Sequence, residues 1–433
     1  MRGALAAALR APWLKDPLWT RARMVPSLDL RFEDALLRDS VSGQRLVTFT
    51  RASTGTYVGS DGLVKTAAVD EARITHDPTT GRRLGLLLEE ARTNLLLRSE
   101  EFDNASWTKQ NITVTANTVT APDGALTADT ITDTLDGSAV VHSLSQTTSG
   151  YGSGAAVTAS VFAKAGTMPR IQILMVSGVT FSSGNKAATC NLATGGLASI
   201  SVGVTATAVA YPNGWWRVSI TATTDDAGSI NFIVRPENGS SPNYQGDGTG
   251  TIHVWGAQLE VGSFPTSYIP TTGTTVTRAA DIATITGTNF SSWYRQDEQT
   301  CYVEAVSPPL GQFGVVGADN GTTSERWRIY GNAGNNTSGA LVVDGNVIQL
   351  NATFAGGWPA TTFSKQALGL QLNNAALASD GVIALTDTAV TMPTTTNLTI
   401  GEATSIAKLN NTISRLTYWP RRLPNPTLQS LTR

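Results

Sequence analysis

The sequence predicts an all-β protein with two jelly-roll-like β-sandwiches in tandem, which follow a small β adaptor and an N-terminal docking arm. Charged residues make up only 15% of the chain, whereas globular proteins average about 25%. Short runs of alternating apolar and polar residues recur about every 8 to 20 residues, and Gly, Asp and Asn turns separate them. The pattern contains no helical segments between successive strands, which excludes a parallel α/β fold.

The first sandwich is expected over residues 99–270, and it ends in its clearest strand, TIHVWGAQLE. The period-2 alternation of that strand predicts that Ile252 and Val254 face one side of the sheet, whereas Trp255 and Ala257 face the other. A glycine and two prolines follow, and they end the strand because proline cannot donate to a β-ladder.

A second β region is expected over residues 285–433, after a linker of residues 271–284 that is rich in Thr and Gly. Its candidate strands again alternate apolar and polar residues and are bounded by turn residues. The run ISRLTYWPRRLPNPTLQSLT closes the chain, and Pro426 suits the first turn of a final helix.

Residues 27–98 are predicted to form the small β adaptor, with tight turns such as Ser60-Asp61-Gly62 between short strands. Six charged residues of this segment lie in apolar surroundings: Arg51, Asp70, Glu71, Glu89, Glu90 and Arg92. Mutual ion pairs are the preferred interpretation, because no nucleophile in the segment is paired with a base.

Residues 1–26 form an apolar and basic arm. Leu5, Leu9 and Trp13 recur at roughly helical spacing, and Trp19 follows them. Such an arm cannot bury its apolar side alone, and two exposed tryptophans would be costly, so docking onto a partner protein is predicted. The alternative is a frayed terminus that packs on its own domain.

Composition excludes several classes of function. The net charge of −2 implies no general attraction to nucleic acids, and no apolar run reaches the roughly 18 residues of a membrane-spanning helix. The two cysteines, Cys190 and Cys301, are far apart, so no disulfide framework is expected. Catalytic serine, zinc-protease and phosphate-loop motifs are absent, so no catalytic residue is assigned and the chain is not expected to be an enzyme.

Three runs of sequence carry a resemblance to a known group of proteins. The run WGAQLE-x-GSFPTSYIPTTG-x-TVTRAAD, at residues 255–281, resembles a pattern that recurs in tail fibres and related virion proteins of tailed bacteriophages. There it ends a β-sandwich that is similar to carbohydrate-binding modules. The runs VTFTRASTGTYVGSDGLVKTAA and GLLLEEARTNLL resemble the segment that precedes that sandwich. Residues 285–433 resemble a concanavalin-like lectin or laminin-G-type domain.

This resemblance implies a bacteriophage virion protein, assembled in the host cytoplasm and located in a tail fibre or another external appendage. The arm would contact other virion proteins, and the sandwiches would bind a host-surface glycan without catalysis. Fibres of this kind are commonly homo-trimers, and repetition of weak sites would raise the overall affinity.

Sugar sites combine an aromatic platform with polar side chains, because sugars have apolar C–H faces and hydroxyl rims. Eight residues are candidates on this basis: Trp107, Tyr211, Trp216, Arg217, Tyr244, Trp327, Tyr330 and Trp358. No organic cofactor is expected, and a structural calcium ion is left open, with Asp123, Asp133 and Glu260 as candidate ligands.

Two alternative functions remain open at this point. One is a purely structural virion component, such as a capsid fibre, decoration or baseplate protein, whose sandwiches contact neighbouring subunits. The other is a glycan-degrading tailspike that uses a pair of carboxylates brought together by the fold.

Overall fold

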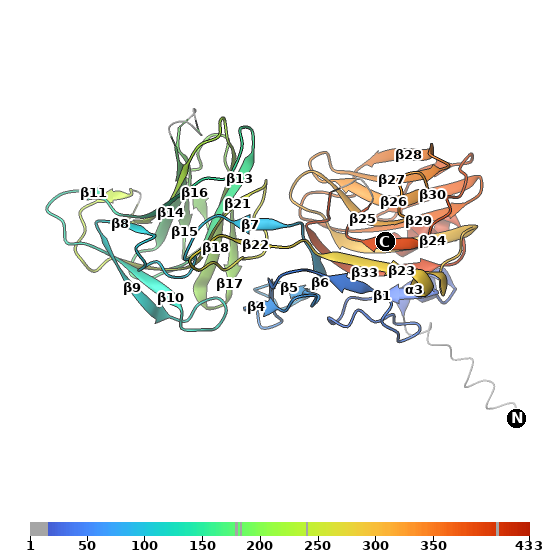
Figure 1. Cartoon of the computed structure of the whole chain (residues 1–433), viewed down its shortest axis with the longest axis horizontal. Coiled ribbons are helices and arrows are strands. Elements are labelled where there is room, and N and C mark those ends of the chain that lie inside the picture. The colour runs from blue at the N-terminus through green and yellow to red at the C-terminus, as the bar shows by residue number, and fades with distance from the viewer. Residues whose placement is uncertain (1–15, 178–180, 182–183, 240, 404–406) are drawn as a thin grey trace, which may run out of the picture.

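The computed structural model describes residues 16–177, 181, 184–239, 241–403 and 407–433, and it confirms the all-β class. Two β-sandwiches lie side by side along the long axis of the molecule, and a small hairpin lies between them (Figure 1). Within the described residues, no helix is both long and apolar enough to cross a bilayer.

The first sandwich consists of two six-stranded antiparallel sheets. One sheet has the order β17 (Thr205–Tyr211), β18 (Trp215–Thr223), β13 (Ala156–Ala165), β21 (Thr251–Val261), β10 (Ala128–Asp133) and β9 (Ile112–Val119). The other has the order β16 (Leu197–Ala198), β15 (Lys186–Asn191), β14 (Arg170–Val176), β19 (Ile230–Glu237), β12 (Ser143–Thr148) and β8 (Thr108–Gln110). Two short strands, β11 (Val140–Val141) and β20 (Asn243–Tyr244), pair with each other at one end.

Strand β21 departs at one residue from the strict alternation between core and outer face. Ile252 and Val254 face the core between the sheets, and Trp255 packs on the outer face, as predicted. Gly256 then adopts a φ of +62°, and the register with β13 shifts next to it. This irregularity is a β-bulge, and it returns Ala257 to the core side, so the predicted orientation of Ala257 is wrong.

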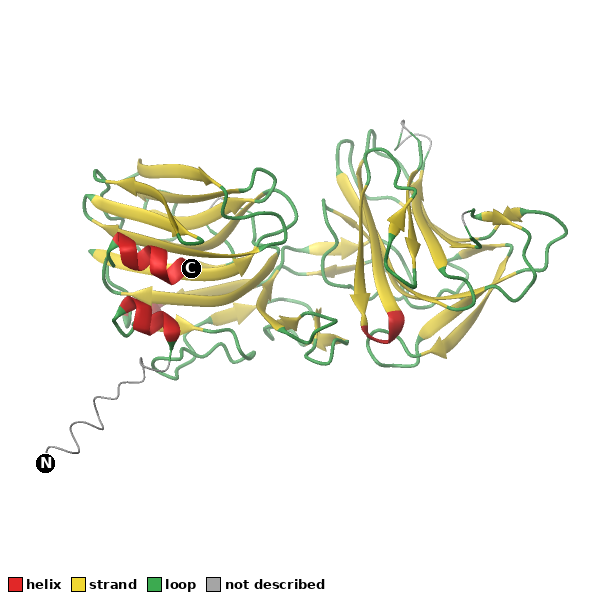
Figure 2. Cartoon of the chain, turned by 180° about the vertical axis from the view of Figure 1, so that it is seen from behind, coloured by secondary structure: helices red, strands yellow, loops and turns green. Residues whose placement is uncertain are grey.

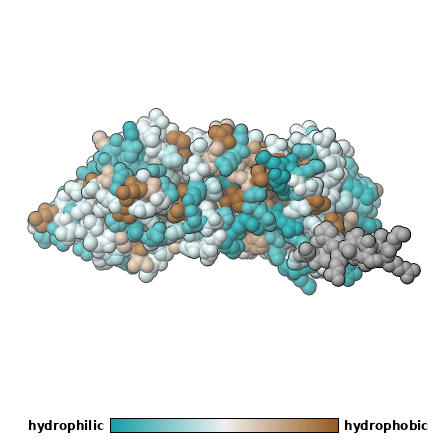
Figure 3. All heavy atoms as spheres, turned by 90° about the horizontal axis from the view of Figure 1, so that it is seen from below, coloured by the Kyte–Doolittle hydropathy of each residue, from teal (hydrophilic) through white to brown (hydrophobic). Residues whose placement is uncertain are grey.

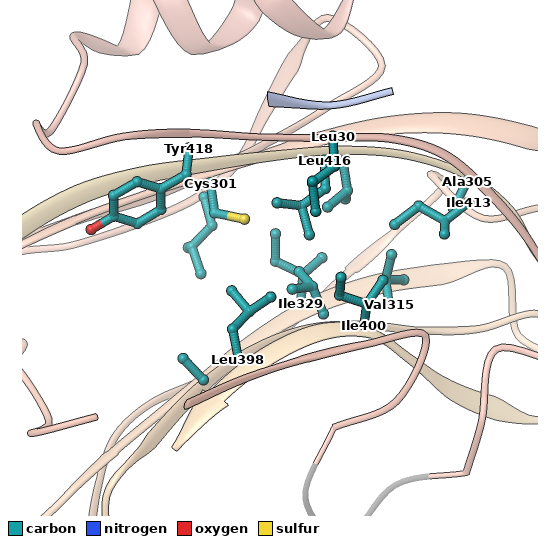
Figure 4. Packing of buried hydrophobic residues seen from close by; sticks show 14 of the residues in the cluster. Leu30, Cys301, Ala305, Val315, Ile329, Leu398, Ile400, Ile413, Leu416 and Tyr418 are labelled. Carbon is teal, nitrogen blue, oxygen red and sulfur yellow. The ribbon is translucent and has the colours of Figure 1, made fainter. Parts of the chain in front are cut away.

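The second sandwich consists of an eight-stranded and a seven-stranded sheet. The first has the order β31 (Val382–Asp387), β30 (Asn374–Ser379), β29 (Phe363–Gln371), β24 (Glu298–Val306), β33 (Asn411–Trp419), β6 (Arg83–Leu88) and β5 (Ile74–His76), with β1 (Leu28–Leu30) also paired to β33. The second has the order β2 (Thr48–Thr50), β23 (Ile282–Thr286), β32 (Asn397–Ile400), β25 (Gln312–Asp319), β26 (Arg326–Asn332), β27 (Thr337–Asp344) and β28 (Val347–Ala355). Side chains of the two sheets, such as Leu416 and Leu398, point toward one another and form the core (Figure 4).

The predicted adaptor is therefore not a separate domain. Four of its strands, β1, β2, β5 and β6, complete the sheets of the second sandwich, and the first sandwich is inserted between them and the rest. Local alternation reveals a strand but not its partner: Leu28 lies opposite Tyr418, near the other end of the chain. The remaining adaptor strands, β3 (Gly55–Val58) and β4 (Val64–Ala67), form a hairpin of their own.

The predicted linker of residues 271–284 is also partly strand. Its β22 (Val276–Arg278) pairs with β7 (Arg92–Asn94), and its last residues begin β23. The two segments that enter and leave the inserted sandwich thus lie side by side (Figure 1).

The predicted docking arm falls into two parts. Leu5, Leu9 and Trp13 lie outside the described residues. Trp19, on helix α2 (Pro17–Ala22), is 4% exposed, and its indole N–H donates to Asp29 at 3.2 Å. The predicted docking role of Trp19 is therefore wrong, because its ring packs on the second sandwich of the same chain.

Helix α2 packs against the final helix α4 (Asn425–Thr432) on the outer side of the eight-stranded sheet (Figure 2). Helix α4 carries Pro426 in its first turn, where the sequence predicts it. The remaining short elements are helix α3 (Gly287–Ser291) and the 3₁₀ turn η2 (Pro212–Gly214).

Candidate functional site

Most of the aromatic side chains predicted to bind sugars lie inside the protein. Five of the eight candidates are buried: Trp107, Tyr244, Trp327, Tyr330 and Trp358. Their polar atoms mostly have internal partners; the Trp107 indole donates to the Arg98 carbonyl at 3.0 Å, and the Trp327 indole donates to the Tyr294 hydroxyl at 2.9 Å. Buried rings offer no face on which a sugar could stack, so this part of the prediction does not hold. Proximity to turn residues in the sequence does not say which face of a strand a ring occupies.

The adjacent pair on β18 divides between the two faces of its sheet. Trp215 packs on the outer face and donates to the Thr120 carbonyl at 3.1 Å. Trp216 packs partly against the core and donates to the Leu192 carbonyl at 2.9 Å. Trp216 is therefore also engaged internally, which leaves Tyr211 and Arg217 as the candidates at a cavity.

These two residues line a cavity of about 170 Å³ between the first sandwich and the β3–β4 hairpin, here called the junction cavity. Tyr211 and Arg217 form its wall on the first sandwich. The opposite wall consists of Tyr57 and neighbours on the hairpin, and residues 265–268 close a third side.

Two hydrogen bonds fix the position of the Arg217 side chain, and one of its N–H donors remains unpaired in the described part of the chain. Its two terminal nitrogens donate to the Thr266 carbonyl at 2.7 Å and the Ser160 hydroxyl at 3.1 Å, and its guanidinium lies 5.4 Å from the Phe162 ring centre. Its Nε has no hydrogen-bond partner among the described residues. Burial raises the pKa of Tyr211, so its hydroxyl stays neutral and can donate or accept.

A second, more open groove of about 500 Å³ lies along the β3–β4 hairpin, and Tyr57 lines both spaces. We call this space the hairpin groove. Its polar lining includes Asp61, Lys65, Glu71 and His76. Lys65 and Asp61 form an ion pair of 2.8 Å. In Figure 3, seen from below the view of Figure 1, the middle of the molecule carries hydrophilic residues with small apolar spots among them.

The sequence reasoning missed Tyr57 and the hairpin groove. The run GTYVGSDGLVK does show an aromatic residue, Tyr57, four positions before the Asp61-Gly62 pair of a turn, which could have indicated an exposed hairpin. The sequence does not show which domain this hairpin faces, so it does not indicate Tyr57 as a ligand contact.

A buried cluster of charges lies beneath the junction cavity. Arg73 donates to Glu89 at 2.8 Å and also to Asp281, and Arg51 lies 3.2 Å from Asp281. Burial raises the pKa of Glu89, but the charges of Arg278 and Arg73 and two hydrogen bonds from Ser267 outweigh burial and lower this pKa to about 2. Glu89 is therefore a fixed anion at neutral pH.

The predicted ion pairs of residues 27–98 are found in part. Arg92 pairs with Glu90 at 2.5 Å, as predicted. Asp70 instead accepts from the backbone N–H of Arg51, and the partner of the Arg51 side chain is Asp281. Arg51 and Asp281 lie on opposite sides of the inserted sandwich in the sequence, so no local pattern predicts that they pair.

The runs that carry the bacteriophage resemblance meet at this junction. The amide N–H₂ of Asn94 donates to the carbonyls of Ala257 at 3.0 Å and Ile269 at 2.8 Å. Glu260, which is fully buried, accepts from the backbone N–H and the hydroxyl of Thr266 at 2.9 and 2.7 Å. The hydrogen bonds of Asn94 and Glu260 therefore connect the first sandwich to the segment that follows its last strand.

The candidate calcium ligands are not brought together. Asp133 accepts from the Gly250 N–H at 2.9 Å, Glu260 is bonded to Thr266, and Asp123 closes a turn. Across the ranges that the structure describes, no group of three or more His, Cys, Asp or Glu side chains is arranged to hold a metal ion.

No protein-family model and no curated protein sequence matches the chain. Among solved structures, the chain is similar to the CBM40 domain of the Ruminococcus gnavus IT-sialidase, bound to alpha2,3 sialyllactose. The identity is 12%, the match covers 33% of this chain and 86% of that one, and the TM-score is 0.30.

Two further similar structures are a leech enzyme and a neurotoxin domain. A leech intramolecular trans-sialidase matches at 16% identity over 32% of this chain and 23% of that one, with a TM-score of 0.29. The binding domain of botulinum neurotoxin serotype D matches at 9% identity over 35% and 40%, with a TM-score of 0.27. Similarity this distant says nothing about what the present chain binds.

Proposed function

We propose that this chain is a non-catalytic glycan-binding protein of a bacteriophage virion, and that its ligand lies across the junction cavity and the hairpin groove. Glycan binding is proposed because of the residues that line these two adjoining spaces. Tyr57 lines both, Tyr211 and Arg217 line one, and carboxylate and ammonium groups line the other. Clefts with an apolar ring and a few convergent polar groups are typical ligand sites.

The charges around the hairpin groove favour a neutral sugar. Three carboxylates, Glu33, Asp61 and Glu71, line this groove beside one ammonium group, Lys65. An anionic sugar would meet a net negative lining, whereas the hydroxyls of a neutral hexose can donate to carboxylates and accept from Lys65. The apolar sugar face would lie on the Tyr57 ring.

The virion part of the proposal is supported by the sequence resemblance. We place the protein in a tail fibre or a similar adsorption appendage, as a homo-trimer that binds host-surface glycans at several weak sites at once. Residues 1–15 directly precede helix α2, which is held on the second sandwich. Those residues, with Leu5, Leu9 and Trp13, are the proposed contact with other virion proteins.

A glycan array followed by titration calorimetry tests the binding part. The Tyr57→Ala variant is expected to weaken binding about tenfold, since a lost stacking contact costs roughly 1–1.5 kcal/mol. Phe363→Ala removes an exposed ring from the second sandwich and serves as the matched control, with unchanged affinity. Absence of binding by the folded wild-type protein to any glycan or host cell would refute the glycan proposal.

Particle composition tests the virion part separately. Mass spectrometry and antibody labelling of purified particles are expected to locate the protein on an external appendage. Deletion of residues 1–15 is expected to prevent incorporation while glycan binding by the isolated protein persists. Incorporation of the truncated protein would overturn the proposed contact.

A purely structural virion component is the second candidate, and one observation favours it. The edge strand β28 exposes two neighbouring apolar side chains, Val347 at 59% and Ile348 at 60%. Exposed apolar residues on an unpaired strand edge favour contact with another protein chain. Val347→Lys would then impair assembly, whereas the glycan-binding function would be unaffected by this substitution.

A further inference from the structure

The longest stretch of the chain without a charged residue forms one edge of the first sandwich. Residues 187–216 contain no Asp, Glu, Lys or Arg, although charged residues make up 15% of the chain. Strand β17 is the last strand of one six-stranded sheet and β16 is the last strand of the other, and both belong to this stretch. The two strands are in contact, so the sheets end in uncharged strands on the same side of the sandwich.

Apolar side chains are exposed along this edge. In the loop that leads into β17, Ile200 is 47% exposed and Val202 is 91% exposed, and Val209 on β17 itself is 45% exposed. Lys186, the charged residue just before the stretch, is buried and donates to the Val202 carbonyl at 3.2 Å. Exposed apolar residues that follow one another along an edge favour contact with another protein surface.

Strand β17 lacks the features that usually protect a free edge from pairing, which are charges, prolines, bulges and very short strands. Its seven residues include no charge and no proline, and they pair with β18 in one unbroken register. By contrast, β8 at the far end of the other sheet carries Lys109, and the pairing of β9 with β10 contains a register shift. An unprotected edge presents backbone N–H and C=O groups to a further strand.

The side chains of β17 fit those of an identical strand. Ala206 and Ala208 pack against the core, whereas Thr205, Thr207 and Val209 are exposed on the other side of the strand. In an antiparallel pair of two β17 strands with Thr207 opposite Thr207, Ala206 lies opposite Ala208 on the core side. Thr205 then lies opposite Val209 on the exposed side. All of these side chains are small or β-branched, and no like charges lie opposite each other.

We propose that β17 is a contact between two copies of this chain, and that it joins their six-stranded sheets into one continuous antiparallel sheet. The two copies are related by a two-fold axis, as in other contacts that use the same surface on both partners. Two identical surfaces meet without electrostatic repulsion only where neither carries a net charge, and residues 187–216 meet this condition. A charged partner would find no opposite charge in this stretch.

This contact is separate from the proposed glycan site and from the three-fold contact of the proposed trimer. A two-fold contact joins copies in pairs, so the assembly contains an even number of copies, either two or, where trimers pair, six. The pairing also covers an edge that would otherwise be open to strands of unrelated chains.

Light scattering of the full chain over a dilution series tests the proposal. The wild-type mass is expected to be an even multiple of the chain mass. Thr207→Lys places two like charges opposite each other at the centre of the contact, so it is expected to raise the dissociation constant of the pair about tenfold or more. Thr115→Lys makes the same change at an exposed position on β9, the other edge strand of this sheet, and is the matched control. An odd multiple for the wild type, or equal dissociation of both variants, would overturn the proposal.

Disulfide trapping identifies the paired strand directly. Opposite residues of antiparallel strands have Cα atoms about 4.5–5.5 Å apart, a distance that a disulfide spans. Thr207→Cys is therefore expected to give a covalent dimer under mild oxidation, whereas Thr115→Cys gives none. The two native cysteines, Cys190 and Cys301, are buried and do not interfere. Failure of Thr207→Cys to cross-link, or a cross-link formed only in a mixture of the two variants, would overturn the proposal, because the mixed product would show that β17 pairs with β9 of another copy.

Discussion

Asp281→Asn is the substitution that most directly tests the role of the buried charge cluster. The Asp281 carboxylate is 1% exposed, and it binds Arg73, lies 3.2 Å from Arg51 and accepts from the Glu89 backbone N–H at 2.8 Å. The asparagine keeps the shape but removes the charge, which leaves the buried Arg51 without its counter-ion and Arg73 with Glu89 alone. Removal of one partner from a buried ion pair costs about 3–5 kcal/mol.

Urea unfolding followed by tryptophan fluorescence measures this cost. With a slope of about 3 kcal/mol per molar urea, the loss corresponds to a midpoint lowered by about 1–1.7 M. Asp61→Asn is the matched control, because Asp61 pairs with Lys65 at 2.8 Å on the surface, where a pair contributes about 0–1 kcal/mol. If both variants show the same midpoint as the wild type at an unchanged slope, the cluster does not stabilise the junction and the reasoning fails.

Three further predictions concern other parts of the molecule. Glu89 has a folded-state pKa of about 2 against an ordinary value of 4.5, so its contribution to stability is complete above pH 4.5 and declines as the pH falls toward 2. This contribution is about 3 kcal/mol, and Glu89→Gln should flatten the unfolding free energy between pH 5 and pH 3 relative to the wild type. Trp19→Ala should destabilise the second sandwich by about 3–5 kcal/mol in calorimetry, whereas an unchanged melting temperature would mean that the helix carrying Trp19 does not pack. Gly262 has a φ of +149° and its missing Cβ would meet the Arg92 guanidinium, so Gly262→Ala should lower stability by more than about 1 kcal/mol in urea unfolding, and a neutral result would contradict this geometry.

The all-β class and the division into two sandwiches follow from the sequence, because alternation and turn residues are local signals. Ile252 and Val254 face the core as their alternation predicts. Ala257 lies on the side opposite to the one predicted, because a bulge at Gly256 shifts the alternation of the strand by one residue. A glycine within a strand is only a weak sequence signal for such a bulge. The adaptor and the linker were mistaken for separate parts because strand pairing over most of the chain length leaves no local trace.

The candidate site was predictable only in small part. Tyr211 and Arg217 do line a cavity, but the tryptophans that resemble sugar platforms are buried in the cores. Composition cannot separate a core tryptophan from a surface one when both stand on short strands near turns. Tyr57 escaped notice because its importance depends on which domain its hairpin faces, and that depends on the insertion.

The inserted topology dictates an order of events during synthesis. The first sandwich is complete once β21 has left the ribosome, whereas Leu28 must wait for Tyr418 before β1 can pair. At translation rates of about 5–20 residues per second, this delay lasts roughly 20–80 s. During that interval the apolar side chains of β1 and β6 lack their partner strand β33. Once β21 has emerged, the nascent chain carries a folded first sandwich beside an incomplete second one. We expect ribosome-bound chains to need a holding chaperone at this stage, and release to coincide with the pairing of β33 with β1 and β6.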